Sequence, residues 1–367
     1  MRVLNILADE NIPGVEACFG KLGRVSRVPG RGLDNAHMRA VDVLLVRSVT
    51  RVDEALLDGH TPCFVGTATS GIDHVDIAYL KTRGIGFSHA PGANANSVVE
   101  YVLAAIAASG DQLERLLAGG TAGIVGYGHI GTAMVSCLEA LGISCMVHDP
   151  WLDRSQLENP ASLEEVLASQ IISLHAELTR EEPWPSFHLL SEPELASIER
   201  DSLLINASRG PVIDNLALLQ RLRCGPGPAV VLDVWEGEPV INRELLDLVT
   251  LGTPHIAGYS LDGKILATRM LSAALQRQLQ YPVESGEGSP PPPELPVPAR
   301  LSGAALLRYL VEARYPIERD DLALRDAALT DPGDGSAFDA LRRNYPQRRE
   351  LRGSVVNGLE PGAADRA

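Results

Sequence analysis

The sequence predicts an α/β protein built from two doubly wound domains, Rossmann-like or flavodoxin-like, with an interdomain cleft and a small α+β domain at the C-terminal end. Short β-rich runs alternate with amphipathic segments and glycine turns, a pattern typical of βαβ units around parallel sheets. An alanine-rich helical stretch separates two such series. A segment rich in Pro, Gly and Ser then precedes residues 300–367.

The first domain is expected to comprise residues 1–96 and 259–280. Its predicted strands are Val3–Ala8, Val43–Val46 and Phe64–Gly66. A helix over Ser97–Ser109, an apolar stretch, is expected to bridge to the second domain. A further helix is expected from Leu261 to about Leu279.

The second domain is expected over residues 97–258. Its predicted strands are Gly123–Val125, Ser144–His148, Ile171–Leu174, Leu203–Asn206 and Val230–Asp233, and its predicted helices are Ile130–Leu141, Leu163–Ala168 and Asn215–Leu222. Residues 281–299, which include Pro290–Pro293, have the composition of a linker. Residues 300–367 are expected to form the third, small domain.

The composition excludes several classes of function. The chain has 367 residues, 45% of them hydrophobic, and a formal net charge of −15. Such a protein can bury several cores, but it lacks the basic face that nucleic acid or an anionic membrane requires. No apolar run approaches the roughly 20 residues of a membrane span, so a cytoplasmic protein is expected.

Cysteine and histidine spacing predicts neither disulfides nor a metal site. The five cysteines are scattered without a CxxC pair, and their odd number argues against a complete disulfide framework. The nine histidines form no HExxH motif and no Cys/His cluster at ligand spacing, so no metal is expected.

A glycine run, Gly126-Tyr-Gly128-His129-Ile130-Gly131, follows a predicted strand and opens a predicted helix. In such a run Gly126 permits the tight turn, Gly128 lets the backbone approach a pyrophosphate, and Gly131 lets the helix pack on the sheet. Alone, the run is also compatible with an ordinary glycine turn. Its position favours a dinucleotide site at the helix N-terminus, with His129 and Ile130 among the cofactor-binding residues.

Asp149 stands at the end of the next predicted strand, about 20 residues after the glycine run, where a carboxylate binds the ribose hydroxyls. Its charge would repel a 2′-phosphate, and Pro150 and Trp151 follow it rather than Arg. NAD is therefore the expected cofactor, in preference to NADP. The alternative is that Asp149 is a turn residue before Pro150.

An acid/base pair is predicted at His255 and Glu238. Oxidising a secondary alcohol requires a base for the hydroxyl proton, and histidine suits this role near neutral pH. A carboxylate that is hydrogen-bonded to the imidazole fixes its tautomer and stabilises the imidazolium. Glu238, which precedes Pro239, fits that second role.

Arg209 is the candidate for gripping the carboxylate of a 2-hydroxy acid, because a planar guanidinium binds carboxylates bidentately. It lies between Ser208 and Gly210, after a predicted strand. Taken singly, Arg209 and Glu238 are better explained as partners in loop salt bridges, and His255 as a loop histidine. Their positions at successive strand ends favour one ligand site.

These motifs resemble those of the D-isomer-specific 2-hydroxyacid dehydrogenase family, over essentially residues 1–280. The resemblance rests on the glycine run, on Asn206-Ala-Ser-Arg-Gly-Pro-Val-Ile-Asp214 and on Asp233-Val-Trp-Glu-Gly-Glu-Pro239. Four further segments, 8–13, 46–50, 66–71 and 255–260, look like a branch of the family that oxidises 4-phospho-D-erythronate with NAD. Segments 318–321, 338–342 and 344–350 resemble the C-terminal dimerisation domain of that branch, which implies a homodimer acting on a small phosphorylated hydroxy acid.

The resemblance also implies roles for individual residues. It places Arg209 and Glu238 in the active site and His255 in proton transfer. The implied cofactor positions are Asp149, Ala207, Ser208, Asp233 and Gly258, and the implied substrate positions are Ser48, Thr69 and Tyr259. For Ser48, Thr69 and Tyr259, the alternative is turn or packing chemistry.

The phosphate of such a substrate requires cations. Arg47 is the first candidate. The pairs Arg342-Arg343 and Arg348-Arg349 are the second, on the hypothesis that the tail of one protomer leans over its partner's cleft; the alternative is a solvated helix face.

One departure from the family pattern affects the cofactor site. Ala176-Glu177 stands where Thr-Pro is usual, which removes a hydroxyl near the cofactor. Three readings of the function stay open: oxidation of phosphoerythronate, another D-2-hydroxyacid dehydrogenase such as one acting on D-3-phosphoglycerate, and a non-catalytic NAD-sensing dimer.

Overall fold

The computed structural model describes residues 3–283, 291–298, 300–331 and 333–358. The chain divides into two compact units. The first comprises Met1–Asn94 and Ser260–Pro291, and the second comprises Ala95–Tyr259 and Pro292–Ala367. Of the expected linker, residues 281–299, positions 284–290 and 299 lie outside the described residues. The fold class predicted from the sequence is confirmed: both units are built on parallel sheets.

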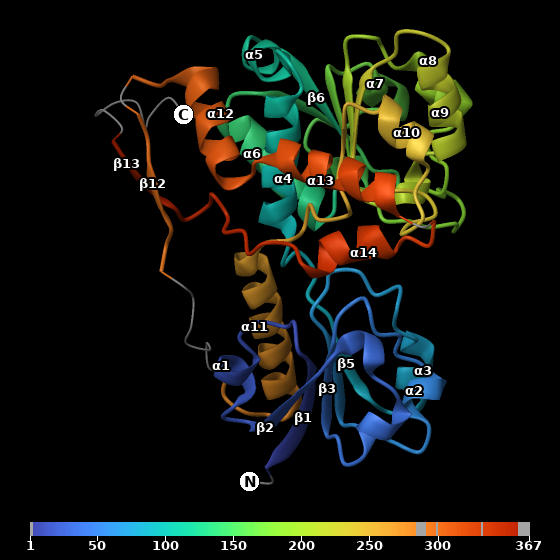
Figure 1. The fold of residues 1–367 in the computed structure, drawn as a ribbon, viewed down its shortest axis with the longest axis vertical. Helices are drawn as coiled ribbons and strands as arrows, with labels where there is room; N and C mark the ends of the chain where they lie inside the picture. Colours follow the sequence, from blue (N-terminus) through green and yellow to red (C-terminus); the bar gives the residue numbers. More distant parts are fainter. Residues whose placement is uncertain (1–2, 284–290, 299, 332, 359–367) are drawn as a thin grey trace. The chain divides into compact units, whose positions relative to one another are not determined.

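The first unit contains a five-stranded parallel sheet of order β2-β1-β3-β4-β5 (Figure 1). Its strands are β1 (Leu4–Asp9), β2 (Gly23–Val28), β3 (Val43–Val46), β4 (Phe64–Thr67) and β5 (Gly86–Ser88). This is the flavodoxin-like strand order. The three strands predicted from sequence are β1, β3 and β4, each within one residue at either end, whereas β2 and β5 at the sheet edges were missed.

Helices cover both faces of this sheet. They are α1 (Val15–Phe19), α2 (Glu54–Leu57), α3 (Ile77–Thr82) and α11 (Leu261–Gln278). Ile6, Leu45 and Phe64 pack with residues of α1 and α11 in one core. Leu44 and Val65, which alternate with them, pack with residues of α2 and α3 in another.

The second unit contains a six-stranded parallel sheet of order β11-β10-β9-β8-β6-β7. Its strands are β6 (Thr121–Val125), β7 (Ser144–His148), β8 (Ile171–Leu174), β9 (Leu203–Asn206), β10 (Ala229–Leu232) and β11 (Leu251–Gly252). Val147 of β7 also forms an isolated parallel bridge with Pro160. Because the strand order reverses at β6, the switch point of the sheet lies where the glycine run begins.

Helices also cover both faces of the second sheet. They are α4 (Ala95–Ala108), α5 (Gln112–Leu117), α6 (His129–Ala140), α7 (Leu163–Leu167), α8 (Glu192–Ser197), α9 (Asn215–Arg223) and α10 (Arg243–Leu248). Residues of α4 and α6 share one core with the sheet. Residues of α7, α8, α9 and α10 share the other. The predicted helices at Ser97–Ser109 and Ile130–Leu141 correspond to α4 and α6.

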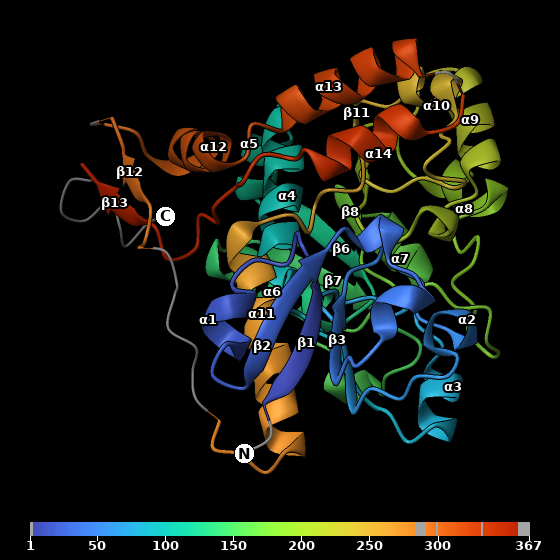
Figure 2. The same cartoon turned by 60° about the horizontal axis from the view of Figure 1, so that its bottom comes forward.

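The described residues of 292–358, here called the C-terminal segment, belong to this second unit, and the helices of the segment pack on its other elements (Figures 1 and 2). The segment contains β12 (Glu294–Pro296), α12 (Gly303–Arg314), α13 (Ile317–Thr330), α14 (Ser336–Arg343) and β13 (Val355–Asn357). Helices α12 and α13 contact α4, α13 also contacts β11 and α10, and α14 packs on α13. Tyr315 packs in the core that contains residues of α4 and α6, and Phe338 packs in the core that contains residues of α7 to α10. Within the described part of the chain, no helix combines the length and apolar character needed to cross a membrane.

Candidate active site

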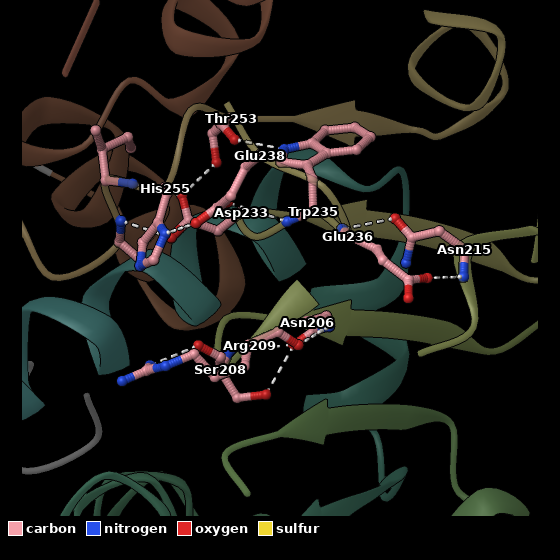
Figure 3. A network of polar contacts seen from close by, with 12 residues as sticks. Asn206, Ser208, Arg209, Asn215, Asp233, Trp235, Glu236, Glu238, Thr253 and His255 are labelled. Carbon is pink, nitrogen blue, oxygen red and sulfur yellow. Dashed lines mark hydrogen bonds and ion pairs between the residues drawn. The ribbon is translucent and has the colours of Figure 1, made fainter. Parts of the chain in front are cut away.

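Three neighbouring parallel strands, β9, β10 and β11, end at one edge of the second sheet and lead into the loops that carry Arg209, Glu238 and His255. Each strand is short and almost wholly buried, so polar side chains begin only where the strand ends. Figure 3 shows Arg209 and His255 extending toward the same side of the resulting network. The sheet thus brings together three residues that are separated in sequence.

His255 and Glu238 form a directly bonded pair. Nδ1 of His255 lies 2.5 Å from Oε1 of Glu238, and both side chains are about a quarter exposed, at 29% and 25%. An ionised carboxylate only accepts hydrogen bonds, so Nδ1 carries the hydrogen and Nε2 of the neutral ring is left as an acceptor. His255 has a backbone φ of 55°, in the left-handed region, and its N–H donates to the carbonyl of Asp233 over 2.7 Å.

The carboxyl of Glu238 is held in its ionised form. Burial raises its pKa, but the charge that His255 carries when protonated, the hydrogen bond to His255 and the charge of Arg342 together bring the pKa below its ordinary value. The N–H of Trp235 adds a weak hydrogen bond of 3.3 Å to Oε2. A negative charge therefore stands beside the imidazole at neutral pH.

The carboxylate of Asp233 holds the loop that carries His255 by accepting hydrogen bonds from it. Its side chain is 1% exposed and accepts hydrogen bonds from the hydroxyl of Thr253 at 2.7 Å and from the N–H groups of Ile256 at 2.7 Å and Ala257 at 2.9 Å. Burial raises its pKa, although the charge of His255 opposes this. The family resemblance offered Asp233 as a cofactor position. Its role as the anchor of this loop had no local sequence signal.

The turn that carries Arg209 is organised by Asn206. Its amide donates to the carbonyl of Arg209 over 3.0 Å, and its side-chain oxygen accepts from the N–H and the hydroxyl of Ser208 at 3.1 and 2.9 Å. A Cβ at Gly210 would lie 2.1 Å from the backbone of Trp235, so only glycine lets the two loops approach this closely. Nη1 of Arg209 donates to the carbonyl of Ser208 at 2.9 Å.

The glycine run fits a dinucleotide. Gly126 has a φ of 92°, and a Cβ at Gly131 would lie 2.0 Å from the carbonyl oxygen of Gly126, so both glycines are required by the turn itself. Gly128, by contrast, has no atom within 4 Å of an added Cβ, and it caps the N-terminus of α6. Gly128 and His129 are exposed there, and Ile130 is half-buried. The open space at Gly128 is where a pyrophosphate would approach.

Asp149 lies immediately after β7, next to the glycine run. Its Oδ2 accepts from the N–H of Tyr127 at 2.8 Å, and its Oδ1 accepts from the N–H of Trp151 at 3.0 Å. Each oxygen keeps a further lone pair for a ribose hydroxyl. Ala176, at the departure from the family pattern, also lies here: its backbone nitrogen is 2.6 Å from the position of a Cβ on Gly126.

The remaining predicted positions lie in different units. Ala207 is buried and Gly258 half-buried in the second unit. Tyr259, also there, makes an edge contact with Tyr345, with the ring centroids 5.8 Å apart.

Arg47, Ser48 and Thr69 belong to the first unit. Ser48 is exposed, and the hydroxyl of Thr69 donates to the carbonyl of Gly71 at 2.8 Å. Nε of Arg47 lies 3.1 Å from the fully buried Oδ2 of Asp9.

One group among the described residues has the spacing of metal ligands: His188, Asp214 and Glu236. Nε2 of His188 lies 2.8 Å from Oε1 of Glu236, and Oδ1 of Asp214 accepts the N–H groups of Leu216 and Ala217 at the start of α9. Protein hydrogen bonds therefore account for the contacts of this group. The three residues are far apart in sequence, which is why sequence spacing gave no sign of them.

Comparison with known proteins defines the class. The family model described as the NAD-binding domain of D-isomer specific 2-hydroxyacid dehydrogenases matches residues 100–257, and a domain of unknown function matches residues 290–365. Among solved structures, NAD⁺-bound 3-phosphoglycerate dehydrogenase from Entamoeba histolytica matches with a TM-score of 0.65 and 21% identity, covering 78% of this chain and 99% of the other. The protein is an NAD-dependent oxidoreductase of the D-isomer specific 2-hydroxyacid dehydrogenase class, and the prediction of NAD is confirmed.

More similar relatives narrow this class. Erythronate-4-phosphate dehydrogenase from Cellvibrio japonicus is 44% identical over 95% of this chain and 93% of its own length. The enzyme of the same name from Hahella chejuensis is 43% identical over 99% of this chain and 96% of its own. The chain belongs to the erythronate-4-phosphate dehydrogenase family, as its motifs predicted.

Proposed function

We propose that the protein oxidises 4-phospho-D-erythronate to (R)-3-hydroxy-2-oxo-4-phosphooxybutanoate with NAD, in the biosynthesis of pyridoxal 5′-phosphate, as a cytoplasmic homodimer. The observation that carries the proposal is the bonded pair His255–Glu238, which shares one sheet edge with Arg209 in a dinucleotide-binding unit. The relatives named above, matched over nearly their whole length, support the choice of substrate.

His255 is the proposed base. Its Nδ1 is engaged by Glu238, so Nε2 is the atom that accepts the proton of the substrate's C2 hydroxyl. Glu238 stays ionised and stabilises the imidazolium that forms. NAD, when bound, accepts the hydride from C2. The hydrogen-bonded support from Asp233 and Thr253 holds the loop, so the ring needs no reorganisation when it takes the proton.

Arg209 is the proposed partner of the substrate carboxylate. Its fork of donors can hold the carboxylate bidentately, which fixes C2 relative to His255. The Asn206 turn and the close approach at Gly210 set the direction from which the guanidinium reaches out. This grip selects 2-hydroxy acids over simple alcohols.

Further substrate contacts are proposed at Ser48, Thr69 and Tyr259, with Arg47 near the phosphate. Asp149 and the glycine run, Gly126 to Gly131, would hold the NAD, together with the strand-end positions Ala207, Ser208, Asp233 and Gly258. The C-terminal segment is the proposed dimerisation element.

The function is tested by following NADH absorbance with purified protein, NAD and either 4-phospho-D-erythronate or D-3-phosphoglycerate. A 2-oxo acid trap is added because oxidation of a hydroxy acid by NAD is uphill. Strong preference for phosphoerythronate supports the proposal. Activity on phosphoglycerate alone would assign the protein to a different 2-hydroxy acid. No NADH formation with either substrate, in a protein that still binds NADH, would favour a non-catalytic NAD-sensing protein.

A further inference from the structure

Helix α14 brings a cation from the C-terminal segment to the predicted acid/base pair of the same chain. Arg342 lies near the end of this helix, with its guanidinium carbon 6.0 Å from the centroid of the Tyr259 ring. Its positive charge is close enough to Glu238 to lower the pKa of that carboxyl. A residue that follows His255 in the chain by nearly ninety positions thus belongs to the surroundings of the active site.

Contacts at both ends of α14 fix this placement. At its start, Gly335 lies so close to Pro239 that a Cβ there would be 2.7 Å from the Pro239 backbone. Phe338, 3% exposed, is buried in the same core as Trp235. Beyond the helix, Tyr345 packs edge-on against Tyr259. The helix therefore sits on the loop that carries Glu238, and the Arg342 side chain starts from an anchored backbone.

Arg342 differs from other arginines of the C-terminal segment in its ion pairs, whereas a buried Nε without a hydrogen-bond partner is common to Arg314, Arg342 and Arg348. Arg308, Arg325 and Arg348 each form an ion pair with a carboxylate: Glu114, Asp321 and Glu100, respectively. Among the described residues, the buried Nε of Arg342 has no hydrogen-bond partner. A buried donor without a partner is costly, unless a ligand supplies the acceptor.

Two other candidate cations, Arg348 and Arg47, already form ion pairs with buried carboxylates. Arg348 is 8% exposed and bonded to Glu100, so it is not available to a ligand. Arg47 lies against the buried carboxylate of Asp9, whose charge it offsets. A substrate with a carboxylate and a phosphate needs more positive charge than Arg209 provides. Arg342 lies beside Tyr259, its charge acts on Glu238, and its Nε has no acceptor among the described residues.

We propose that Arg342 binds the phosphate of the substrate, in the same chain as His255 and Glu238, and that this contact selects a phosphorylated 2-hydroxy acid over its unphosphorylated counterpart. The inference rests on the proposed function. It also gives the C-terminal segment a role in substrate recognition, in addition to its proposed role in dimerisation.

The test compares wild type, Arg342→Gln and Arg343→Gln on 4-phospho-D-erythronate and on D-erythronate. Arg343 is the exposed next residue of the same helix and serves as the matched control. Arg342→Gln is expected to lower kcat/KM for the phosphorylated substrate about 10- to 100-fold, chiefly through KM, and to leave D-erythronate oxidation within about twofold. Arg343→Gln is expected to leave both unchanged. Equal losses of Arg342→Gln on the two substrates would overturn the inference.

A binding readout separates this inference from the proposed function. Inorganic phosphate is titrated calorimetrically into wild type and both variants, with thermal unfolding confirming that each is folded. Weaker phosphate binding in Arg342→Gln alone supports the inference, even if wild type oxidises neither substrate and the proposed function fails. Equal phosphate affinity in wild type and Arg342→Gln, or no phosphate binding to wild type, overturns it.

Discussion

Thr253 donates its hydroxyl to Asp233 over 2.7 Å beneath the loop that carries His255. That oxygen of Thr253 also lies 2.8 Å from the phenol oxygen of Tyr101 on α4. Because the single hydrogen of Thr253 goes to the carboxylate, the Tyr101 hydroxyl is the donor in the second contact. A buried chain of three side chains thus joins helix α4 to the loop that carries His255.

Thr253→Val should break this chain. The substitution leaves the buried Tyr101 hydroxyl without its partner and removes one of the two hydrogen bonds that Oδ1 of Asp233 accepts, the other being from the N–H of Ile256. This should cost about 1–3 kcal/mol of unfolding free energy. Thr253→Ser keeps the hydroxyl and is the matched control. Denaturant unfolding of the three proteins gives the comparison, and equal stability of the two variants would show that the hydroxyl contributes little.

His255→Ala should lower turnover by about 10²- to 10⁴-fold and leave NADH affinity nearly unchanged, because only the proton acceptor is removed. Glu238→Gln should also lower turnover, since an amide cannot stabilise the imidazolium. The double variant should be little worse than the worse single variant, because the two residues act as one unit. Loss of NADH binding in His255→Ala would instead indicate a structural role.

Arg209→Lys should harm use of the substrate more than binding of the cofactor. An ammonium cannot reproduce the bidentate grip of a guanidinium, so kcat/KM should fall by roughly 10- to 100-fold. Arg221→Lys, on α9 of the same unit, is a control that should change nothing. If Arg209→Lys weakened NADH binding as much as it slowed oxidation, the residue would belong to the cofactor site.

The parts of the fold and site that could be predicted share a local signal. Strands β3, β8 and β9 are mostly apolar runs that are buried along their whole length, and each was predicted with its observed bounds. The edge strand β2 is rich in polar residues and has no buried residue, and β5 has only three residues. Neither segment therefore carried a clear apolar run that would predict a strand. The glycine run could be predicted because the strand-to-helix turn itself requires glycine at positions 126 and 131, so the spacing is visible in the sequence.

What could not be predicted depends on contacts between distant segments. Nothing around Asp233 indicates that its carboxylate would bind the backbone of residues 256 and 257. Likewise, the arginine pairs 342–343 and 348–349 suggested a cation for the substrate phosphate, but the sequence did not indicate which of these arginines forms an ion pair with a carboxylate. Arg348 meets Glu100 across 248 positions of sequence, and Arg342 reaches the Glu238 loop only because α14 packs there.

Gly128→Ala and Gly131→Ala should separate the two requirements of the glycine run. A Cβ at Gly128 meets no atom of the protein, so stability should hold while NADH affinity falls about tenfold, because the methyl occupies the approach of the pyrophosphate. A Cβ at Gly131 collides with the carbonyl of Gly126, so this variant should lose stability as well. Fluorescence titration with NADH, together with thermal unfolding, distinguishes them. Unchanged NADH affinity in Gly128→Ala would argue against the predicted phosphate site.

The contacts of Glu100, which join α4 to the C-terminal segment, should make the free energy of unfolding depend on pH. Oε1 of Glu100 accepts the N–H groups of Leu351 and Arg352, and Oε2 accepts from Arg348. Burial raises the pKa of Glu100 to about 7, against the charge of Arg348. The folded protein therefore binds this proton more tightly than the unfolded chain does. The resulting stability is fully present below about pH 4.5 and is lost as the pH rises through 7, an effect of about 3 kcal/mol.

Glu100→Gln removes the titrating group, so its stability should fall less than that of wild type between pH 5 and pH 8, whatever its absolute value. Glu114→Gln is the control, because the ion pair with Arg308 lowers the pKa of Glu114 and moves its titration below this range. Denaturant unfolding at the two pH values measures both differences. Parallel losses of stability in wild type and Glu100→Gln would mean that Glu100 is ionised in the folded protein throughout, with Arg348 outweighing the cost of burial.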